Sequence, residues 1–186
     1  MKTKRYISAL VMTMTVFIAC SGDRYGNKDG ALPNTFLIPA DYEGVLRVVY
    51  KEKCGITPKV ENGRQILKFQ NDGLIILNTT VYTGKDNIYY LVDDKGNRTP
   101  VTEIPDFKDR TNKTPVIVVG PVSVSTQYIT SVNSKITTSS GGAAYMDFKL
   151  YNKNIKEIRD EEFYQKLDSL TNAVVNACRT SQLSGR

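Results

Sequence analysis

The residues best able to do covalent chemistry in this sequence are three cysteines, Cys20, Cys54 and Cys178. Cys20 ends an N-terminal leader, and the other two lie in the body of what reads as an exported chain. Two cysteines in an exported chain predict a disulfide, here between Cys54 and Cys178. Two free, half-buried thiols are the alternative. A metal site is disfavoured because two thiolates without histidine fall short of the ligand set that zinc usually takes.

The chain has no histidine. This excludes Ser-His-Asp and Cys-His mechanisms within the chain and removes the commonest metal ligand. Paired carboxylates occur at Asp93/Asp94 and Glu161/Glu162, and carboxylates held about 5–10 Å apart can hydrolyse glycosides. Both pairs have ordinary structural uses, in a predicted turn and in the first turn of a predicted helix. We therefore expect no catalytic residues, no cofactor and no enzymatic activity, with a hydrolase acting through carboxylates alone as the alternative.

Eleven tyrosines without a tryptophan raise the question of carbohydrate binding. Tyr82, Tyr89, Tyr90 and Tyr128 are candidates for a platform on which sugar rings stack. Tyrosine is also a common half-buried residue of β-strands, which is the simpler interpretation.

The charge of the chain does not indicate nucleic-acid binding. The formal net charge is +6, but three of the basic residues, Lys2, Lys4 and Arg5, lie in the leader. The other basic residues are scattered, with no run that would mark a nucleic-acid stripe. We expect a mixed, solvated surface.

Residues 1–19 have the layout of a secretory signal. The positive residues Lys2, Lys4 and Arg5 precede a largely apolar stretch from Tyr6 to Ile18. This stretch is too short for a standard transmembrane helix, which needs about 20 apolar residues.

The end of the leader, Phe17-Ile18-Ala19-Cys20, resembles the lipobox of bacterial lipoproteins. Phe17 departs from the usual leucine. The resemblance implies that Cys20 receives a diacylglycerol, becomes the first residue of the mature chain and is then often acylated again. Its implied partner is a membrane, bound through the lipid anchor at Cys20.

A polar, glycine-rich tether is predicted over residues 20–33. Ser21 after the cysteine resembles lipoproteins that are sent to the outer membrane. We therefore expect an envelope location, lipid-anchored at the outer membrane on its periplasmic or surface face.

The body, residues 34–152, reads as short strands cut by turns. The predicted strands are Val45–Lys51, Gln65–Phe69, Leu74–Val81, Ile88–Val92, Val101–Ile104, Val116–Val119, Val122–Thr130 and Met146–Leu150. Asn62-Gly63 is a strong hairpin signal, and 137–142 has the composition of a flexible loop. Strands at this spacing, without intervening helices, predict a mainly β fold, either an antiparallel β-sandwich or an open barrel.

Residues 153–186 change to a helical period. The apolar residues recur at spacings of three and four: Phe163, Leu167, Leu170, Val174 and Ala177. Asp160 is the predicted N-cap. We expect this stripe to pack on the β-domain; a partner-binding helix is the alternative.

Two runs of the body, Phe36 to Val45 and Phe69 to Gly73, resemble an uncharacterised domain family of bacterial lipoproteins. In that family an Ile-Pro-x-x-Tyr-x-Gly run leads into a strand and a later Asp-Gly turn leads into the next. The resemblance implies structural roles for Pro39, Gly44 and Gly73 and carries no functional residue. Together these observations predict a membrane-anchored envelope lipoprotein that is a non-catalytic binding or structural module, with a protein or a glycan as its partner.

Overall fold

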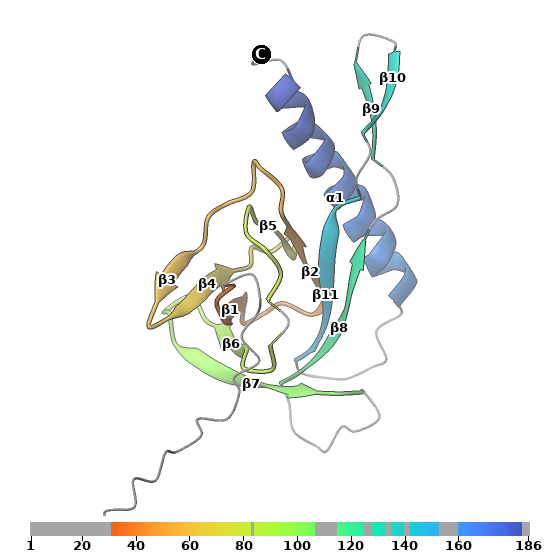
Figure 1. The fold of residues 1–186 in the computed structure, drawn as a ribbon. Helices are drawn as coiled ribbons and strands as arrows, with labels where there is room; N and C mark the ends of the chain where they lie inside the picture. Colours follow the sequence, from red (N-terminus) through yellow and green to blue (C-terminus); the bar gives the residue numbers. More distant parts are fainter. Residues whose placement is uncertain are drawn as a thin grey trace, which may run out of the picture.

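The computed structural model describes residues 31–82, 84–106, 115–124, 128–132, 135–139, 142–152 and 160–183, and Figure 1 shows their fold. Their strands and helix are, in chain order, β1 (Asn34–Pro39), β2 (Gly44–Tyr50), β3 (Lys59–Glu61), β4 (Arg64–Lys68), β5 (Leu74–Ile76), β6 (Ile88–Val92), β7 (Arg98–Ile104), β8 (Val116–Val124), β9 (Tyr128–Val132), β10 (Lys135–Ser139), β11 (Ala144–Tyr151) and α1 (Asp160–Leu183). The predicted signal peptide, Cys20 and most of the predicted tether lie outside the described residues.

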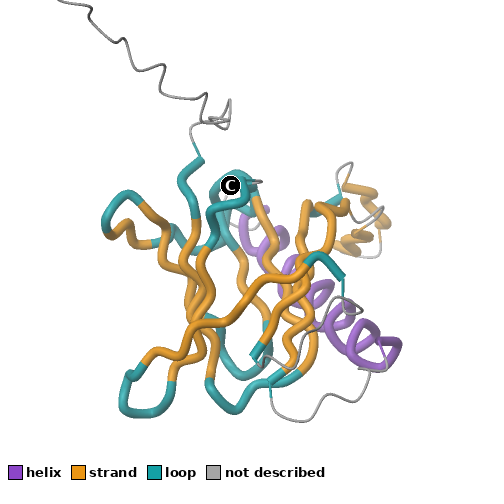
Figure 2. The backbone as a smooth tube through the Cα atoms, turned by 90° about the horizontal axis from the view of Figure 1, so that it is seen from below, coloured by secondary structure: helices purple, strands orange, loops and turns teal. Residues whose placement is uncertain are grey.

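Nine of these strands form one sheet in the order β3-β4-β1-β6-β7-β8-β11-β2-β5, and β9 and β10 form a separate hairpin. The sheet curls into a half-barrel with α1 along one side (Figure 2). Ile56, between β2 and β3, bridges to the end of β5: its amide donates to the carbonyl of Ile76 at 2.9 Å and its carbonyl accepts from the amide of Asn78 at 3.2 Å. The mainly β prediction with a C-terminal helix is confirmed, in the form of a curled sheet.

The prediction of a purely antiparallel sheet was wrong, because the sheet is mixed. β1 lies between β4 and β6 and is parallel to both, and the β2–β5 and β7–β8 pairs are parallel as well. The turn at 71–73 shows the reason. The chain leaves β4, a neighbour of β1, and enters β5, a neighbour of β2, so this turn does not join a hairpin.

The Asn62-Gly63 hairpin is confirmed. β3 and β4 pair antiparallel across it, and both turn residues have positive φ, 50° and 73°, as a type I′ turn requires. The turn at 93–97 likewise joins the antiparallel strands β6 and β7.

Two other predicted boundaries were wrong. β8 runs unbroken from Val116 to Val124, because an extra residue at Gly120-Pro121 is accommodated by a register shift: Val119 and Val122 pair with Phe148 and Met146 of β11. β10 includes residues 137–139 of the predicted flexible loop, because these residues pair with β9.

The half-barrel encloses the larger core, and α1 covers a smaller one on the outer face. β2 contributes to both because its side chains alternate: Leu46 and Val48 point inward, whereas Val45 and Val49 face the helix. This double coverage explains why every residue of β2 is buried.

The buried face of α1 differs from the predicted apolar stripe. Leu167 is buried as predicted, but Phe163 and Val174 are 41% and 39% exposed, whereas Thr171 and Cys178 are buried. Val175, not its neighbour Val174, is the valine that is fully buried. Hydrophobic periodicity missed this rotation because either valine extends an apolar stripe and because Thr171, a polar residue, takes an inward position.

Candidate functional site

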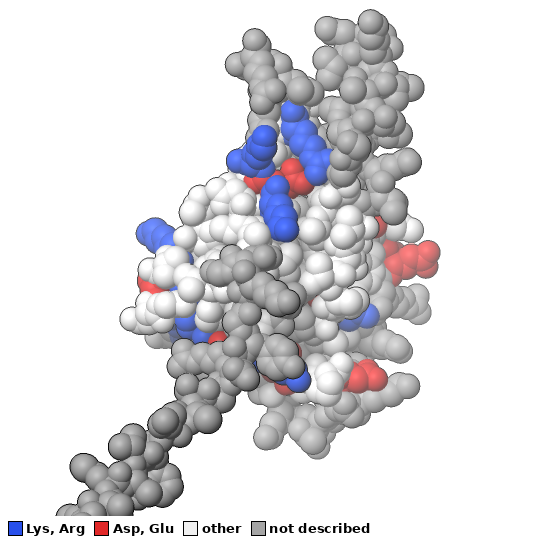
Figure 3. All heavy atoms as spheres, viewed as in Figure 1, with Lys and Arg blue, Asp and Glu red and all other residues white. Residues whose placement is uncertain are grey.

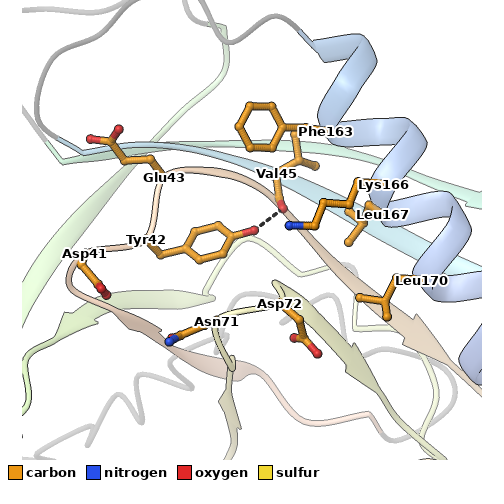
Figure 4. Close-up of a pocket in the computed structure, with 10 residues that line it drawn as sticks. All are labelled: Asp41, Tyr42, Glu43, Val45, Asn71, Asp72, Phe163, Lys166, Leu167 and Leu170. Atoms are coloured by element: carbon orange, nitrogen blue, oxygen red, sulfur yellow. Dashed lines mark hydrogen bonds between the residues drawn. The ribbon is translucent and has the colours of Figure 1, made fainter.

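A pocket of about 280 Å³ opens between the β1–β2 turn, the β4–β5 turn and the first half of α1 (Figure 4). Its lining residues are Asp41, Tyr42, Glu43, Val45, Asn71, Asp72, Phe163, Lys166, Leu167 and Leu170. A concave site with apolar surface and a few convergent polar groups is the usual form of a ligand site.

The β1–β2 turn forms one wall of the pocket. Tyr42 closes the turn through its amide, which donates to the carbonyl of Pro39 at 3.0 Å. Gly44 follows with a φ of +123°, and a Cβ there would lie 2.7 Å from the ring of Phe163. Glycine therefore lets the chain pass directly beneath the helix.

The β4–β5 turn forms the opposite wall. The amide of Gly73, whose φ is +74°, donates to the carbonyl of Gln70 at 3.1 Å. The carboxylate of Asp72 accepts the amide of Leu74 at 3.0 Å. These bonds fix Asp72 and its neighbour Asn71 at the rim.

The side chain of Tyr42 extends from the β1–β2 turn into the space between the two turns (Figure 4). Its hydroxyl donates to the carbonyl of Val45 at 2.7 Å. Burial, followed by the negative charge of Asp72, raises the pKa of Tyr42 to about 12. The hydroxyl is thus held neutral as a fixed donor, a role that suits structure or binding better than proton transfer.

The pocket has an apolar side and a polar side. Val45 and Leu167 are buried, and Phe163 presents its ring at the opening. Three carboxylates, those of Asp41, Glu43 and Asp72, lie on the turns. The ammonium of Lys166 points from the helix toward the Tyr42 hydroxyl (Figure 4). This arrangement can hold a small molecule or a side chain that is partly apolar and partly charged.

A buried arginine fixes the helix behind the pocket. Arg47 of β2, whose side chain is 3% exposed, pairs with Asp147 of β11 at 2.7 Å and with Asp168 of α1 at 2.5 Å. Its guanidinium also lies 4.1 Å from the ring centre of Tyr145. Burial lowers the pKa of Arg47, but hydrogen bonds and charge from the two aspartates outweigh it and raise the pKa above its ordinary value. Because these ion pairs join β2 to β11 and to α1, we assign the cluster a structural role.

The far end of α1 is attached to the segment after β2. Cys54 and Cys178 form a disulfide, with their Cα atoms 5.6 Å apart. Arg179 pairs with Glu52 at 2.5 Å beside it. The structure thus joins the two cysteines that the sequence analysis paired, and it places the bond about two turns of helix beyond Leu170, the last helix residue that lines the pocket.

The four tyrosines proposed as a sugar platform do not form one. Tyr82 and Tyr89 are buried, and Tyr89 stacks on Phe36 in the core at 5.0 Å. Tyr90 is half-buried and, as the next residue of β6, points to the opposite face. Tyr128 lies in β9, where its side chain is outside the described set.

The predicted acidic pairs lie outside the pocket. Asp93 accepts hydrogen bonds from Asn97 and the amide of Lys95, and the bonds from Asn97 are the main cause of a pKa below its ordinary value. A general acid needs the opposite shift. Glu161 and Glu162 are exposed in the first turn of α1.

Sequence reasoning missed the pocket, although it singled out both segments that form its walls. The run from Ile38 to Gly44 was interpreted only as the entry into a strand, and Asn71 to Gly73 only as a turn. Their convergence depends on the parallel pairing of β1 with β4 and of β2 with β5, which periodicity does not reveal.

Two further kinds of site are absent from the described residues. None of the helices they form is long and apolar enough to span a bilayer. These residues also contain no group of three or more Cys, Asp or Glu side chains placed to hold a metal ion. Basic and acidic side chains are interspersed with neutral surface on the face in Figure 3.

The fold and pocket define a β-half-barrel domain with a C-terminal helix. Residues 31–159 match the family model described as "Family of unknown function (DUF6843)", and the chain belongs to this family. Among solved structures it is similar to a protein described as "Putative Lipoprotein from Bacillus anthracis", with a TM-score of 0.51 and 18% identity over 77% of this chain and 94% of that one. No curated protein matches.

Proposed function

We propose that this protein is a lipid-anchored envelope lipoprotein whose domain is a non-catalytic binding module, with the pocket as its binding site. The observation that supports binding is the convergence of two turns and a helix on one cavity with an apolar and a polar side. Anchoring rests on the leader and on Cys20, 11 residues before the first described residue, Ala31. The structural neighbour is itself described as a lipoprotein, which supports this proposed location.

The membrane is proposed to be the outer membrane, because Ser21 does not resemble an inner-membrane retention signal. Separation of inner and outer membranes on a density gradient tests this assignment. Recovery of the protein with inner-membrane markers would reject the outer-membrane assignment while leaving the anchor itself intact.

Binding is tested by capture of the full-length lipoprotein from its native envelope, followed by mass spectrometry. The informative variant is Phe163→Ser, which removes the ring without adding a charge, because Phe163 is 41% exposed at the pocket opening. The matched control is Val60→Ser, at an exposed apolar residue of edge strand β3 that is 56% exposed. We expect Phe163→Ser to remove the bound partner and Val60→Ser to retain it.

Equal recovery of partners by both variants would contradict a binding role for the pocket. The same preparations serve to test the alternative of a hydrolase acting through carboxylates. Turnover of envelope glycans by the wild-type protein, lost on replacement of Asp41 or Asp72, would replace the binding proposal with an enzymatic one.

A further inference from the structure

We propose that the pocket binds a cationic aliphatic group, an alkylammonium or guanidinium carried on an apolar stem. This inference names the ligand class for the site and rests on the proposed binding function. The same chemistry belongs to a free alkylamine and to a lysine or arginine side chain of a partner, and the experiment below separates these sources.

The first argument is charge. Three acidic residues, Asp41, Glu43 and Asp72, and one basic residue, Lys166, line the pocket. The carboxylate of Glu43 points away from the cavity (Figure 4), which leaves Asp41 and Asp72 against Lys166, a formal charge of −1. The whole chain has the opposite sign, +6. Charges around so small a pocket act within roughly one Debye length, about 8 Å at physiological ionic strength. The pocket lining is therefore negatively charged on a positively charged chain, which favours a cation over an anion as its ligand.

The second argument is shape. Val45 and Leu167 supply buried apolar surface on the helix side, and Leu170 and Phe163 extend it toward the opening. An alkyl chain can lie on such a surface while its charged end reaches polar groups at the rim. A volume of about 280 Å³ suits one side chain or a small amine. It is at the low end of pockets that hold drug-sized ligands, which take roughly 300–1,000 Å³.

The third argument is that a cation already extends into the pocket. The ammonium of Lys166 points toward the Tyr42 hydroxyl and the Val45 carbonyl (Figure 4). In the described part of the chain Lys166 forms no ion pair within 4.0 Å: the pairs there are those of Arg47 and Arg179. Lys166 thus occupies the position that the cationic end of a ligand would take, and it competes with that ligand.

Because Lys166 competes with a cationic ligand, its replacement should change the affinity in opposite directions for a cationic and an anionic ligand. Removing the ammonium in Lys166→Met keeps an apolar stem, makes the lining more negative and vacates the position. Affinity for a cation should rise. For an anionic ligand the same substitution would remove the attracting charge, and affinity should fall.

The experiment is an NMR or calorimetric titration of the full-length protein in neutral detergent at fixed salt. The probes are cadaverine, Nα-acetyl-lysine methylamide and its uncharged analogue Nα-acetyl-norleucine methylamide. We expect the wild type to bind at least one cationic probe more tightly than the norleucine analogue. Lys166→Met should tighten that binding about fivefold and Asp72→Asn should weaken it about fivefold, as expected for one exposed charge interaction of about 1 kcal/mol.

Asp94→Asn is the matched control, because Asp94 is an exposed carboxylate in the β6–β7 turn away from the pocket. It should leave the affinity unchanged. Binding of both cationic probes indicates that a free amine suffices, and binding of the lysine derivative alone indicates a side chain of a partner protein. Either result supports the cationic site.

Equal binding of the lysine and norleucine derivatives would overturn the proposal, as would weaker cation binding by Lys166→Met. An absence of binding by every probe would overturn it as well. Such a failure leaves the binding function itself open to its own test, because Phe163→Ser adds no charge to the pocket and the loss of captured partners in that variant does not depend on the charge of the ligand.

Discussion

Gly44 and Gly63 both have positive φ, but only one of them is enclosed. A Cβ on Gly44 would lie 2.7 Å from the Phe163 ring, whereas a Cβ on Gly63 would have nothing within 4 Å. We predict that Gly44→Ala lowers the free energy of unfolding by about 1–3 kcal/mol, from backbone strain and from the displaced ring. Gly63→Ala pays for backbone strain alone and should cost less. Denaturant unfolding of the two variants measures the difference, and equal losses would show that Phe163 is not packed against the turn.

Tyr42 gives the protein a predicted alkaline limit. Its pKa is raised from 10.0 to about 12 in the folded state, so folding favours the neutral phenol. The stabilisation from this shift is complete below pH 10 and is lost as the pH rises through about 12. We predict that the stability of the wild type falls more steeply than that of Tyr42→Phe between these values. Unfolding curves at several alkaline pH values test this, and parallel pH profiles would contradict it.

Arg47 of β2 holds three elements together through its ion pairs. It links β2 to β11 through Asp147 and to α1 through Asp168. Arg47→Met leaves Asp147, whose side chain is 15% exposed, without its partner. Breaking such a buried pair from one side should cost about 3–5 kcal/mol.

The matched control for that variant is Arg98→Met. Arg98 is an exposed arginine whose guanidinium lies 5.7 Å from the ring centre of Tyr90. Its replacement should change stability by no more than about 0.5 kcal/mol. Denaturant midpoints measure both, and a similar loss in the two variants would show that the Arg47 network does not hold the helix.

The disulfide holds the other end of α1. Cys54 and Cys178 are separated by 124 residues in the chain. Closing so long a loop should stabilise the fold by about 4–5 kcal/mol in the chain-entropy model. We predict that Cys178→Ser lowers stability by that order and that Cys20→Ser leaves the bond intact. Non-reducing peptide mapping should find the linked pair, and two alkylatable thiols in the native protein would contradict the structure.

At the scale of elements, the sequence was informative where the interaction is local. Asn62-Gly63 fixed a hairpin because its turn type specifies the pairing of the two flanking strands. The parallel neighbours of β1 were not predictable, since no local signal records which distant strand lies alongside. The rotation of α1 escaped prediction for a similar reason: the partners of Thr171 and Cys178 lie more than 100 residues away. The pocket depends on both features and was missed with them.

At the scale of the whole molecule, the proposed anchor would connect the folded domain to a membrane through the predicted tether. Residues 20–33, fully extended, would span at most about 46–50 Å. Under the proposed anchoring at Cys20, a tether of that reach would keep the pocket near the bilayer and would let it meet partners on the same surface. Membrane attachment would thus raise the effective concentration of any partner that shares the membrane.

The most direct test of this account is the chemistry of Cys20 in the mature protein. Intact-mass and N-terminal peptide analysis of the protein from membranes should show a chain that begins at Cys20 and carries a diacylglycerol and a further acyl group. Cys20→Ser should abolish this modification and release the protein from the membrane fraction. A wild-type chain with an unmodified Cys20 thiol, or unchanged membrane partitioning of Cys20→Ser, would contradict the central claim.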